Sequence, residues 1–214
     1  MTAYAQLVDK VFVLVRRRRM KKFFAHFSPS SEVRLLDIGG EPETWTNEIE
    51  QGLNFHVTQI NLEPRPVPAP LKDKLVAVRA DATALPYADN SFDIAFSNSV
   101  IEHVGGWERQ ELFAREARRV ASKLWVQTPA REFPVEPHLV APLFHYLPKK
   151  WQRKLVRLTP RALMTPSTPA NVLKAAVEEI RLLSHDEFKK LFPDCRILKE
   201  RFLGLTKCYI AVRT

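Results

Sequence analysis

Apolar and polar positions follow two patterns along this chain. Short, mostly apolar runs predict buried strands, because strands covered on both faces are continuously apolar. Longer segments repeat apolar residues every three or four positions, which predicts helices. The predicted strands are residues 33–41 with their turn, 54–60, 75–79, 92–96, 123–127, 196–202 and 206–213, and the main predicted helices are 3–27, 107–120 and 184–192. This alternation indicates an α/β fold with a mostly parallel sheet and an antiparallel strand pair at the end.

Prolines interrupt the alternation in two places. Pro64, Pro66, Pro68 and Pro70 lie between the second and third predicted strands and exclude a regular helix there. Eight further prolines punctuate residues 129–180, an aromatic-rich, basic segment that we interpret as an insertion after the fifth strand. We therefore expect one domain over residues 28–214, preceded by a separate helix within residues 1–27.

The formal charge of +9 is concentrated at the N-terminus. Residues 1–27 hold seven basic residues and one acidic residue, whereas the other 26 basic and 23 acidic residues nearly cancel. Residues 3–27 also have helical apolar spacing at Leu7, Val11, Leu14 and Val15. Two interpretations stay open: a basic amphipathic helix on an anionic membrane surface, or a helix packed on the domain with its arginines in water. The near-neutral remainder lacks a basic stripe with stacking aromatics, so we do not expect nucleic acid as a partner.

Two further features bear on the compartment. The apolar run Val11 to Val15 is far shorter than the roughly 20 residues of a membrane span, and it precedes its basic cluster, unlike a signal peptide. Cys195 and Cys208 are too few for a disulfide framework, which favours a reducing compartment. We expect a cytoplasmic protein, with peripheral attachment to the inner face of the membrane as the variant that the basic helix suggests.

Polar residues and glycines gather where the predicted parallel strands end. The four ends read Asp37-Ile38-Gly39-Gly40, Asn61-Leu62-Glu63, Asp81-Ala82 and Ser97-Asn98-Ser99. Open α/β sheets bind ligands at this edge, and glycine lets a ligand approach the backbone. A polar group after the second strand suits ribose hydroxyls, and a carboxylate after the third suits an adenine amino group. The pattern predicts a nucleoside site, into which we expect Asp37 to point.

Four motifs occur in a distinctive order: Leu35 to Gly40, Ala80 to Ala82 with Leu85-Pro86-Tyr87, Asn90 to Phe96, and Val100 to Val104. Together they resemble the class I S-adenosylmethionine-dependent methyltransferases, and most specifically the small-molecule type 11 branch. The resemblance covers about residues 33–130 and the C-terminal strand pair. It implies a Rossmann-like, mostly parallel seven-stranded sheet of order 3-2-1-4-5-7-6 and S-adenosylmethionine as the cofactor.

The resemblance also implies a set of cofactor-binding residues. Asp37, Gly39 and Gly40 would line the methionine and ribose side, Asp81 and Ala82 the adenine, and Ser97 the sulfonium. Two positions differ from the family pattern: Glu41-Pro42-Glu43 occupies the place of a further glycine, and Asn61 stands where a ribose carboxylate is usual, with Glu63 as its substitute.

Methyl transfer is an in-line displacement, so alignment of acceptor and methyl carbon is its main requirement. A base is needed for a hydroxyl or protonated amine acceptor, and histidine is the usual choice. We predict that the 129–180 insertion forms the site of the methyl acceptor. His138 with Glu136 are its main candidate residues, and His103 is the second candidate. No histidine pair has metal-ligand spacing, so no metal is expected.

The main hypothesis is methyl transfer to a small-molecule or lipid-linked acceptor. Two alternatives stay open: an RNA methyltransferase that uses the basic helix, and a non-catalytic methyltransferase-like scaffold whose altered glycine turn no longer holds cofactor. A nicotinamide dehydrogenase is disfavoured, because the first turn lacks GxGxxG.

Overall fold

The computed structural model describes residues 18–27, 32–46 and 55–214. The chain divides into two compact units. We call Pro29–Ala130 with Arg181–Thr214 the sheet unit, and Arg131–Ile180, which is grouped with Met1–Ser28, the helical unit. Each is described by itself below.

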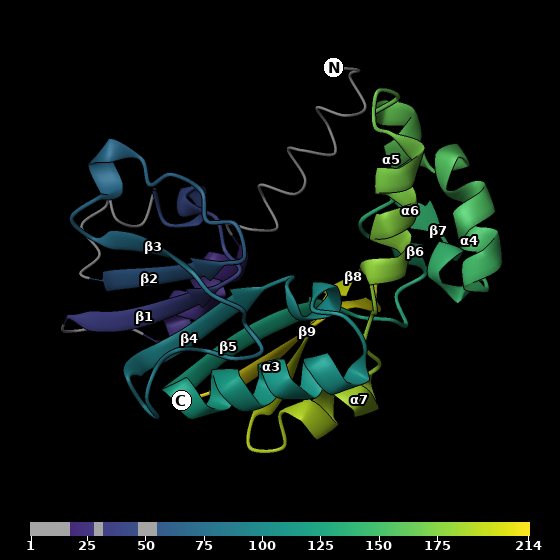
Figure 1. Cartoon of the computed structure of the whole chain (residues 1–214). Coiled ribbons are helices and arrows are strands. Elements are labelled where there is room, and N and C mark those ends of the chain that lie inside the picture. Colours follow the sequence, from purple (N-terminus) through teal and green to yellow (C-terminus); the bar gives the residue numbers. More distant parts are fainter. Residues whose placement is uncertain (1–17, 28–31, 47–54) are drawn as a thin grey trace. The chain divides into compact units, whose positions relative to one another are not determined.

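A seven-stranded sheet forms the sheet unit (Figure 1). Its strands are β1 (Val33–Ile38), β2 (Phe55–Asn61), β3 (Leu75–Arg79), β4 (Phe92–Asn98), β5 (Ala121–Pro129), β8 (Arg196–Phe202) and β9 (Leu205–Arg213). The order is β3-β2-β1-β4-β5-β9-β8, in which β1 to β5 are parallel and β9 is antiparallel to both β5 and β8. The labels differ from the expected 3-2-1-4-5-7-6 only because β6 and β7 form a separate small sheet, so β8 and β9 are the sixth and seventh strands here. The α/β fold and its mostly parallel sheet are confirmed.

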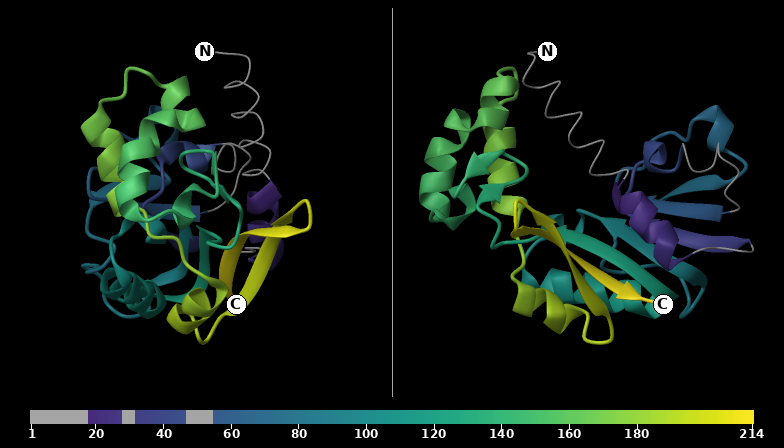
Figure 2. Two further views of the ribbon diagram at one scale, coloured as in Figure 1. Left: turned by 90° about the vertical axis from the view of Figure 1, so that its right-hand side faces the viewer. Right: turned by 180° about the vertical axis from the view of Figure 1, so that it is seen from behind.

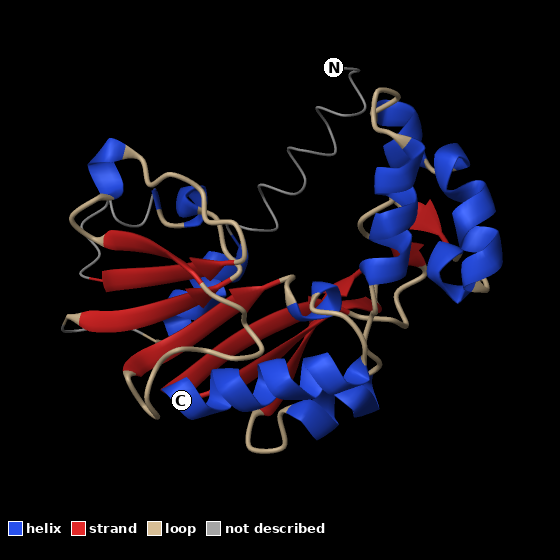
Figure 3. Ribbon diagram, in the orientation of Figure 1, coloured by secondary structure: helices blue, strands red, loops and turns tan. Residues whose placement is uncertain are grey.

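The core of this unit lies along the central strands. Leu35, Leu36 and Ile38 of β1 have no exposed surface, as expected for a continuously apolar strand. Helices α3 (Trp107–Val120) and α7 (His185–Leu191) lie together on one face of the sheet (Figure 3). Both agree with the sequence prediction, and the start of α7 carries the expected capping box between Ser184 and Glu187.

The connection between β2 and β3 contains no α-helix. One 3-10 turn, η2 (Ala69–Leu71), interrupts an otherwise irregular path, so the expected loss of the crossover helix is confirmed. After β1 the chain forms η1 (Pro42–Thr44). From the sequence, Thr44 or Thr46 could also cap a short helix through Gln51, and the part of that helix after Thr46 lies outside the described residues. Of the N-terminal helix expected over residues 3–27, residues 18–26 are helical, and 3–17 are outside the described residues.

The helical unit contains more regular structure than its prolines suggested (Figure 2, green). It comprises β6 (Val135–Glu136), β7 (Ala141–Pro142), η4 (Phe144–Tyr146), α4 (Lys149–Leu155), η5 (Val156–Leu158), α5 (Pro160–Met164) and α6 (Ala170–Glu179). Pro148 and Pro169 cap the starts of α4 and α6, and Pro160 is the first residue of α5, where a missing N–H costs nothing. These prolines therefore lie at helix starts. The three helices α4, α5 and α6 were not predicted from the sequence.

A small core holds the helical unit together. It is formed by Leu139, Ala141, Phe144, Val156, Ala162, Leu173 and Val177. None of the helices in the described ranges is both long enough and apolar enough to span a membrane.

Candidate functional site

The turn after β1 depends on glycine at position 39. Gly39 has a φ of +74°, and a Cβ there would lie 2.6 Å from Cγ1 of Val100. Its N–H donates to the Ile60 carbonyl at 2.8 Å, which joins the ends of β1 and β2. A side chain at position 39 would therefore be strained by both backbone and space.

Asp37 lies beneath this turn and not at its open side. The carboxylate is fully buried, and its Oδ2 accepts from Trp45 Nε1 at 2.8 Å and from Gln59 Nε2 at 2.9 Å. Within the described parts of the chain, Oδ1 has no hydrogen-bond partner. Burial raises the pKa of Asp37 to about 6, against the lowering effect of the two hydrogen bonds. The expectation that Asp37 points into a ligand crevice is thus not met, because its carboxylate is used to hold the turn from inside.

Gly40 is required by the same carboxylate. A Cβ at this position would lie 1.9 Å from Oδ2 of Asp37. Glycine is therefore required at the two positions for different reasons. Gly39 has a positive φ, whereas Gly40 leaves room for the neighbouring Asp37 side chain.

The two departures from the family pattern join neighbouring loops. Asn61 Nδ2 donates to the Gly40 carbonyl at 2.7 Å. Arg65, in the proline-rich connection, binds both carboxylate oxygens of Glu41, each at 2.9 Å. Glu63 is exposed. The contacts of Asn61 and Arg65 thus hold the loop after β1 at the place where the family pattern has a further glycine.

Asp81 follows β3 and remains accessible, with 39% of its side chain exposed. Its Oδ1 accepts from the Thr83 N–H and hydroxyl, both at 2.8 Å, and its Oδ2 accepts from Arg109 Nη2 at 2.9 Å. The Thr83 N–H is the main reason why the pKa of Asp81 is below its usual range, with Arg109 contributing. Arg109 Nε also donates to the Val104 carbonyl at 2.6 Å. An ionised, oriented carboxylate therefore stands at the strand end, with Ala82 next to it in the chain.

The Leu85-Pro86-Tyr87 turn is fixed to α3. Arg119 donates to the carbonyls of Tyr87 and Leu85, at 2.7 and 3.2 Å, while Glu116 accepts from the Leu85 N–H at 2.9 Å. Arg119 and Glu116 are also paired at 2.8 Å. This recognisable sequence motif is thus a structural clamp beside Asp81.

Ser97 and His103 lie at and after the end of β4. The buried Ser97 hydroxyl donates to the Ile38 carbonyl at 3.1 Å, so it connects β4 to the end of β1. His103 ends η3 (Ile101–His103) and is half-buried. Beside it, buried Glu102 accepts from the Thr128 hydroxyl at 3.0 Å.

Glu136 and His138 are brought together in the helical unit. Glu136 Oε1 contacts His138 Nδ1 at 2.7 Å, and Oε2 accepts from the Leu139 N–H at 2.6 Å. Although burial raises the pKa of Glu136, the hydrogen bond from His138, its charge when it is protonated, and the Leu139 N–H together outweigh burial and leave that pKa below its usual range. A buried carboxylate that fixes a histidine ring is the arrangement that orients a general base.

Several residues of this site were missed from the sequence. Gln59 had a detectable signal, since it is an amide in an apolar strand and lies opposite Asp37 in the β1–β2 register. Trp45 and Arg109 had none, because an aromatic after a turn and an arginine on a helix are commonplace.

The strand order, the glycine turn after β1 and the polar ends of β2 to β4 define the fold of class I S-adenosylmethionine-dependent methyltransferases. Residues 36–123 match the type 11 family model described as a methyltransferase domain. An uncharacterized methyltransferase from Mycolicibacterium vanbaalenii is 39% identical over 77 residues, which are 33% of this chain and 29% of that protein. The chain spans about a third of the length of the curated relatives it matches.

Two solved structures share the fold at low sequence identity. Geranyl diphosphate C-methyltransferase from Streptomyces coelicolor, solved with geranyl diphosphate and S-adenosyl-L-homocysteine, is 11% identical with a TM-score of 0.56 over 100% of this chain and 85% of that chain. The 1,6-didemethyltoxoflavin-N1-methyltransferase of Burkholderia thailandensis is 14% identical with a TM-score of 0.55 over 100% of this chain and 91% of that chain.

Proposed function

We propose that this protein transfers a methyl group from S-adenosylmethionine to a small-molecule or lipid-linked acceptor. The observation that carries the proposal is Asp81, an accessible carboxylate kept ionised by Thr83 and Arg109 at the end of β3. It lies inside the segment that matches the methyltransferase family model. A carboxylate with this orientation suits the amino group of an adenine.

The other strand ends fit the remainder of the cofactor. Gly39 and Gly40 would face the methionine and ribose side, with Asp37 supporting them from below. Asn61 binds Gly40 through its Nδ2, and its oxygen has no partner in the described chain, so it suits a ribose hydroxyl; Glu63 is exposed beside it. Ala82 would accompany Asp81 at the adenine, and Ser97 would hold the strand end nearest the sulfonium. The cofactor supplies an activated methyl group, and the protein has to align an acceptor with it.

We assign the acceptor side to His138, oriented by Glu136, with His103 as the second candidate. A neutral His138 would take the proton from a hydroxyl or ammonium acceptor as the new bond to the methyl carbon forms. The two structural neighbours are named for geranyl diphosphate and 1,6-didemethyltoxoflavin, and both are small molecules. They support a small acceptor for this chain and leave its identity open.

Calorimetric titration with S-adenosylmethionine tests the cofactor assignment. The wild-type chain should bind, and Asp81→Asn should weaken binding at least tenfold, because it removes the charge that orients the adenine amine. Asp73→Asn is a matched control, since Asp73 is an exposed carboxylate in the loop before β3. Failure of the wild type to bind at millimolar ligand would favour the non-catalytic scaffold.

A second assay separates binding from catalysis. His138→Gln should retain cofactor affinity but lose S-adenosylhomocysteine release in the presence of a panel of hydroxyl and amine acceptors. Equal release by the variant and the wild type would remove His138 from the mechanism.

We also propose a cytoplasmic location. Cys195 and Cys208 are both buried thiols, which suits a reducing compartment. Cell fractionation tests this, and recovery in an oxidising compartment would contradict it.

A further inference from the structure

The helical unit has a charge of its own. Residues 137–177 contain seven basic residues and no acidic residue. The basic residues are Lys149, Lys150, Arg153, Lys154, Arg157, Arg161 and Lys174. This excess is separate from that of residues 1–27 and belongs to a folded, described part of the chain.

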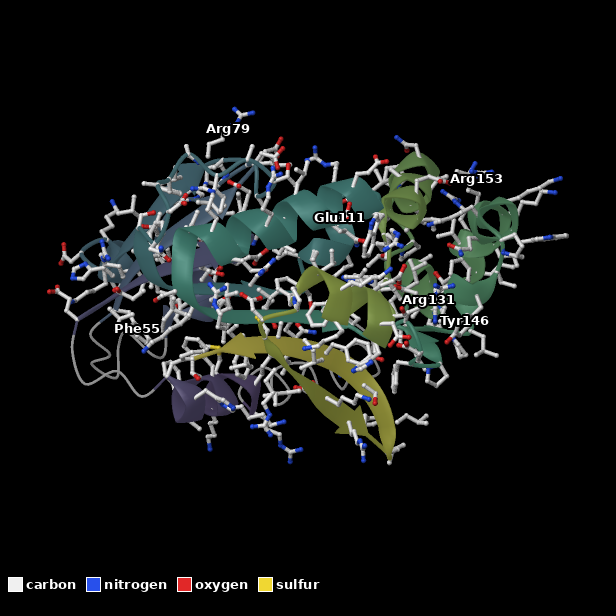
Figure 4. All side chains as sticks on the ribbon, turned by 90° about the horizontal axis from the view of Figure 1, so that it is seen from below. Phe55, Arg79, Glu111, Arg131, Tyr146 and Arg153 are labelled. Carbon is white, nitrogen blue, oxygen red and sulfur yellow. The ribbon has the colours of Figure 1, made fainter. Side chains whose placement is uncertain are left out.

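The five basic residues between positions 149 and 157 fall into two groups. Lys149 donates to the Val177 carbonyl, and Arg153 pairs with Glu178 at 2.8 Å, so both tie α4 to α6 (Figure 4 labels Arg153). Lys150, Lys154 and Arg157 are exposed and pair with no carboxylate in the described residues. The second group is therefore not needed for the fold.

Large apolar side chains are exposed on the same segment. Among them are Leu147, Trp151 and Leu158, with 37%, 52% and 69% of their surface exposed. Trp45 and Trp125, by contrast, are fully buried, and Trp107 is half-buried. An exposed tryptophan between exposed leucines is costly in water unless it has a partner.

These two sets lie side by side along α4 and η5. Leu147 lies two residues before α4, Trp151 lies in the first turn of α4, and Leu158 is the last residue of η5. Lys150 and Arg157 directly precede Trp151 and Leu158 in the chain, and Lys154 Nζ lies 5.3 Å from the Trp151 ring centre. On the other side, Gln152 and Val156 are buried. We call the exposed apolar side chains of Leu147, Trp151 and Leu158, together with the exposed bases Lys150, Lys154 and Arg157, the α4 surface.

We propose that the α4 surface docks on a bilayer containing anionic lipid. Tryptophan and leucine favour the boundary between headgroups and acyl chains, while lysine and arginine reach the anionic headgroups. RNA phosphates would pair with the lysines and the arginine, but the leucines would stay in water, because nucleobases stack on aromatic rings. The inference is independent of the proposed methyl transfer, so either can fail alone.

Vesicle flotation of the full chain tests the proposal. The protein should float with vesicles of phosphatidylcholine and phosphatidylglycerol, stay behind with phosphatidylcholine alone, and be released by salt. Lys150→Gln with Lys154→Gln should weaken partitioning about 30-fold, from about 1 kcal/mol for each base near an anionic surface. Trp151→Ser should weaken it about tenfold by removing the aromatic anchor. All three side chains are exposed, so the variants should fold, and circular dichroism checks this.

Lys199→Gln with Arg201→Gln is the matched control, because it removes two exposed charges from β8 of the sheet unit. An equal loss of vesicle binding by this control would mean that only the net charge of the protein matters, and it would overturn the proposal. So would a loss confined to Arg16→Gln with Arg17→Gln, since the N-terminal segment would then be the anchor. Brominated lipid should quench wild-type emission but quench Trp151→Phe much less. RNA oligonucleotides that displace vesicles and bind more tightly would also refute the lipid assignment.

Discussion

Replacement of Asp37 by asparagine isolates the cost of a buried charge. The pKa of Asp37 is about 6 in the folded protein against an ordinary 3.8, so the folded state binds the proton more tightly than the unfolded state. The stability that this proton provides is fully present below about pH 3.8 and is lost as pH rises through about 6. A difference of about two pKa units corresponds to about 3 kcal/mol. Because Asp37 has no exposed surface, solvent screening does not reduce this figure.

Asparagine preserves the geometry well enough to make the comparison fair. Both hydrogen bonds reach one oxygen of Asp37, so the asparagine oxygen can accept from Trp45 and Gln59. The amide nitrogen then occupies the place of Oδ1, which has no partner in the described residues. The variant keeps the contacts and removes the titration.

Urea unfolding between about pH 4 and pH 7.5 measures the effect. The wild-type free energy of unfolding should fall by about 2.5 kcal/mol relative to that of Asp37→Asn across this range, because the unfolded carboxyl is already partly ionised at pH 4. Asp93→Asn is a control without titration in this range: burial raises the pKa of Asp93, but hydrogen bonds from Arg34 outweigh it and hold that pKa below its usual range, so the stability of the wild type relative to this variant should change mainly below about pH 3.8 and stay nearly constant between about pH 4 and pH 7.5. Parallel pH curves for the wild type and Asp37→Asn would refute the claim that the carboxylate is penalised by burial.

Three further predictions concern the same loops. Gly40→Ala should cost about 2 kcal/mol in urea unfolding, because its Cβ collides with the carboxylate; adding Asp37→Ala should recover part of that loss, and strict additivity would contradict the collision. Arg119→Met should lower stability by about 2 kcal/mol, because it removes the guanidinium that donates to two turn carbonyls and pairs with Glu116 and Asp89; a change in thermal midpoint within error would show that water replaces the guanidinium. If the cofactor assignment holds, Arg109→Met should tighten S-adenosylmethionine binding by two- to fivefold in calorimetry. The reason is that Asp81 would no longer have to break its exposed ion pair with Arg109 in order to bind the adenine. Weaker binding would mean that the guanidinium helps to hold the ligand.

The sheet was readable from the sequence because its strands are buried on both faces. Their unbroken apolar runs, the glycines after β1 and the capping box of α7 are local signals, and each survives in the structure. The helices of the insertion were not readable in the same way. Their prolines are tolerated only at first turns, and whether a proline starts or breaks a helix depends on the tertiary core around Val156 and Leu173.

The candidate site was predictable in its positions but not in its contacts. Asp37 and Asp81 were both identified as acidic strand ends, yet one is buried and carries a raised pKa while the other is exposed with a lowered pKa. That difference comes mainly from the complete burial of Asp37 and from the Thr83 N–H that donates to Asp81. Burial depends on tertiary packing, which carries no local pattern in the sequence. The cofactor-binding and acceptor-site roles stay predictions.

The contact between Asp37 and Gly40 also links two positions in inheritance. During evolution, a residue larger than glycine can be accepted at position 40 only after position 37 has become small. A carboxylate can return to position 37 only while position 40 is still glycine. Among relatives that keep the tryptophan at position 45, we therefore expect the two positions to change in pairs and in a fixed order.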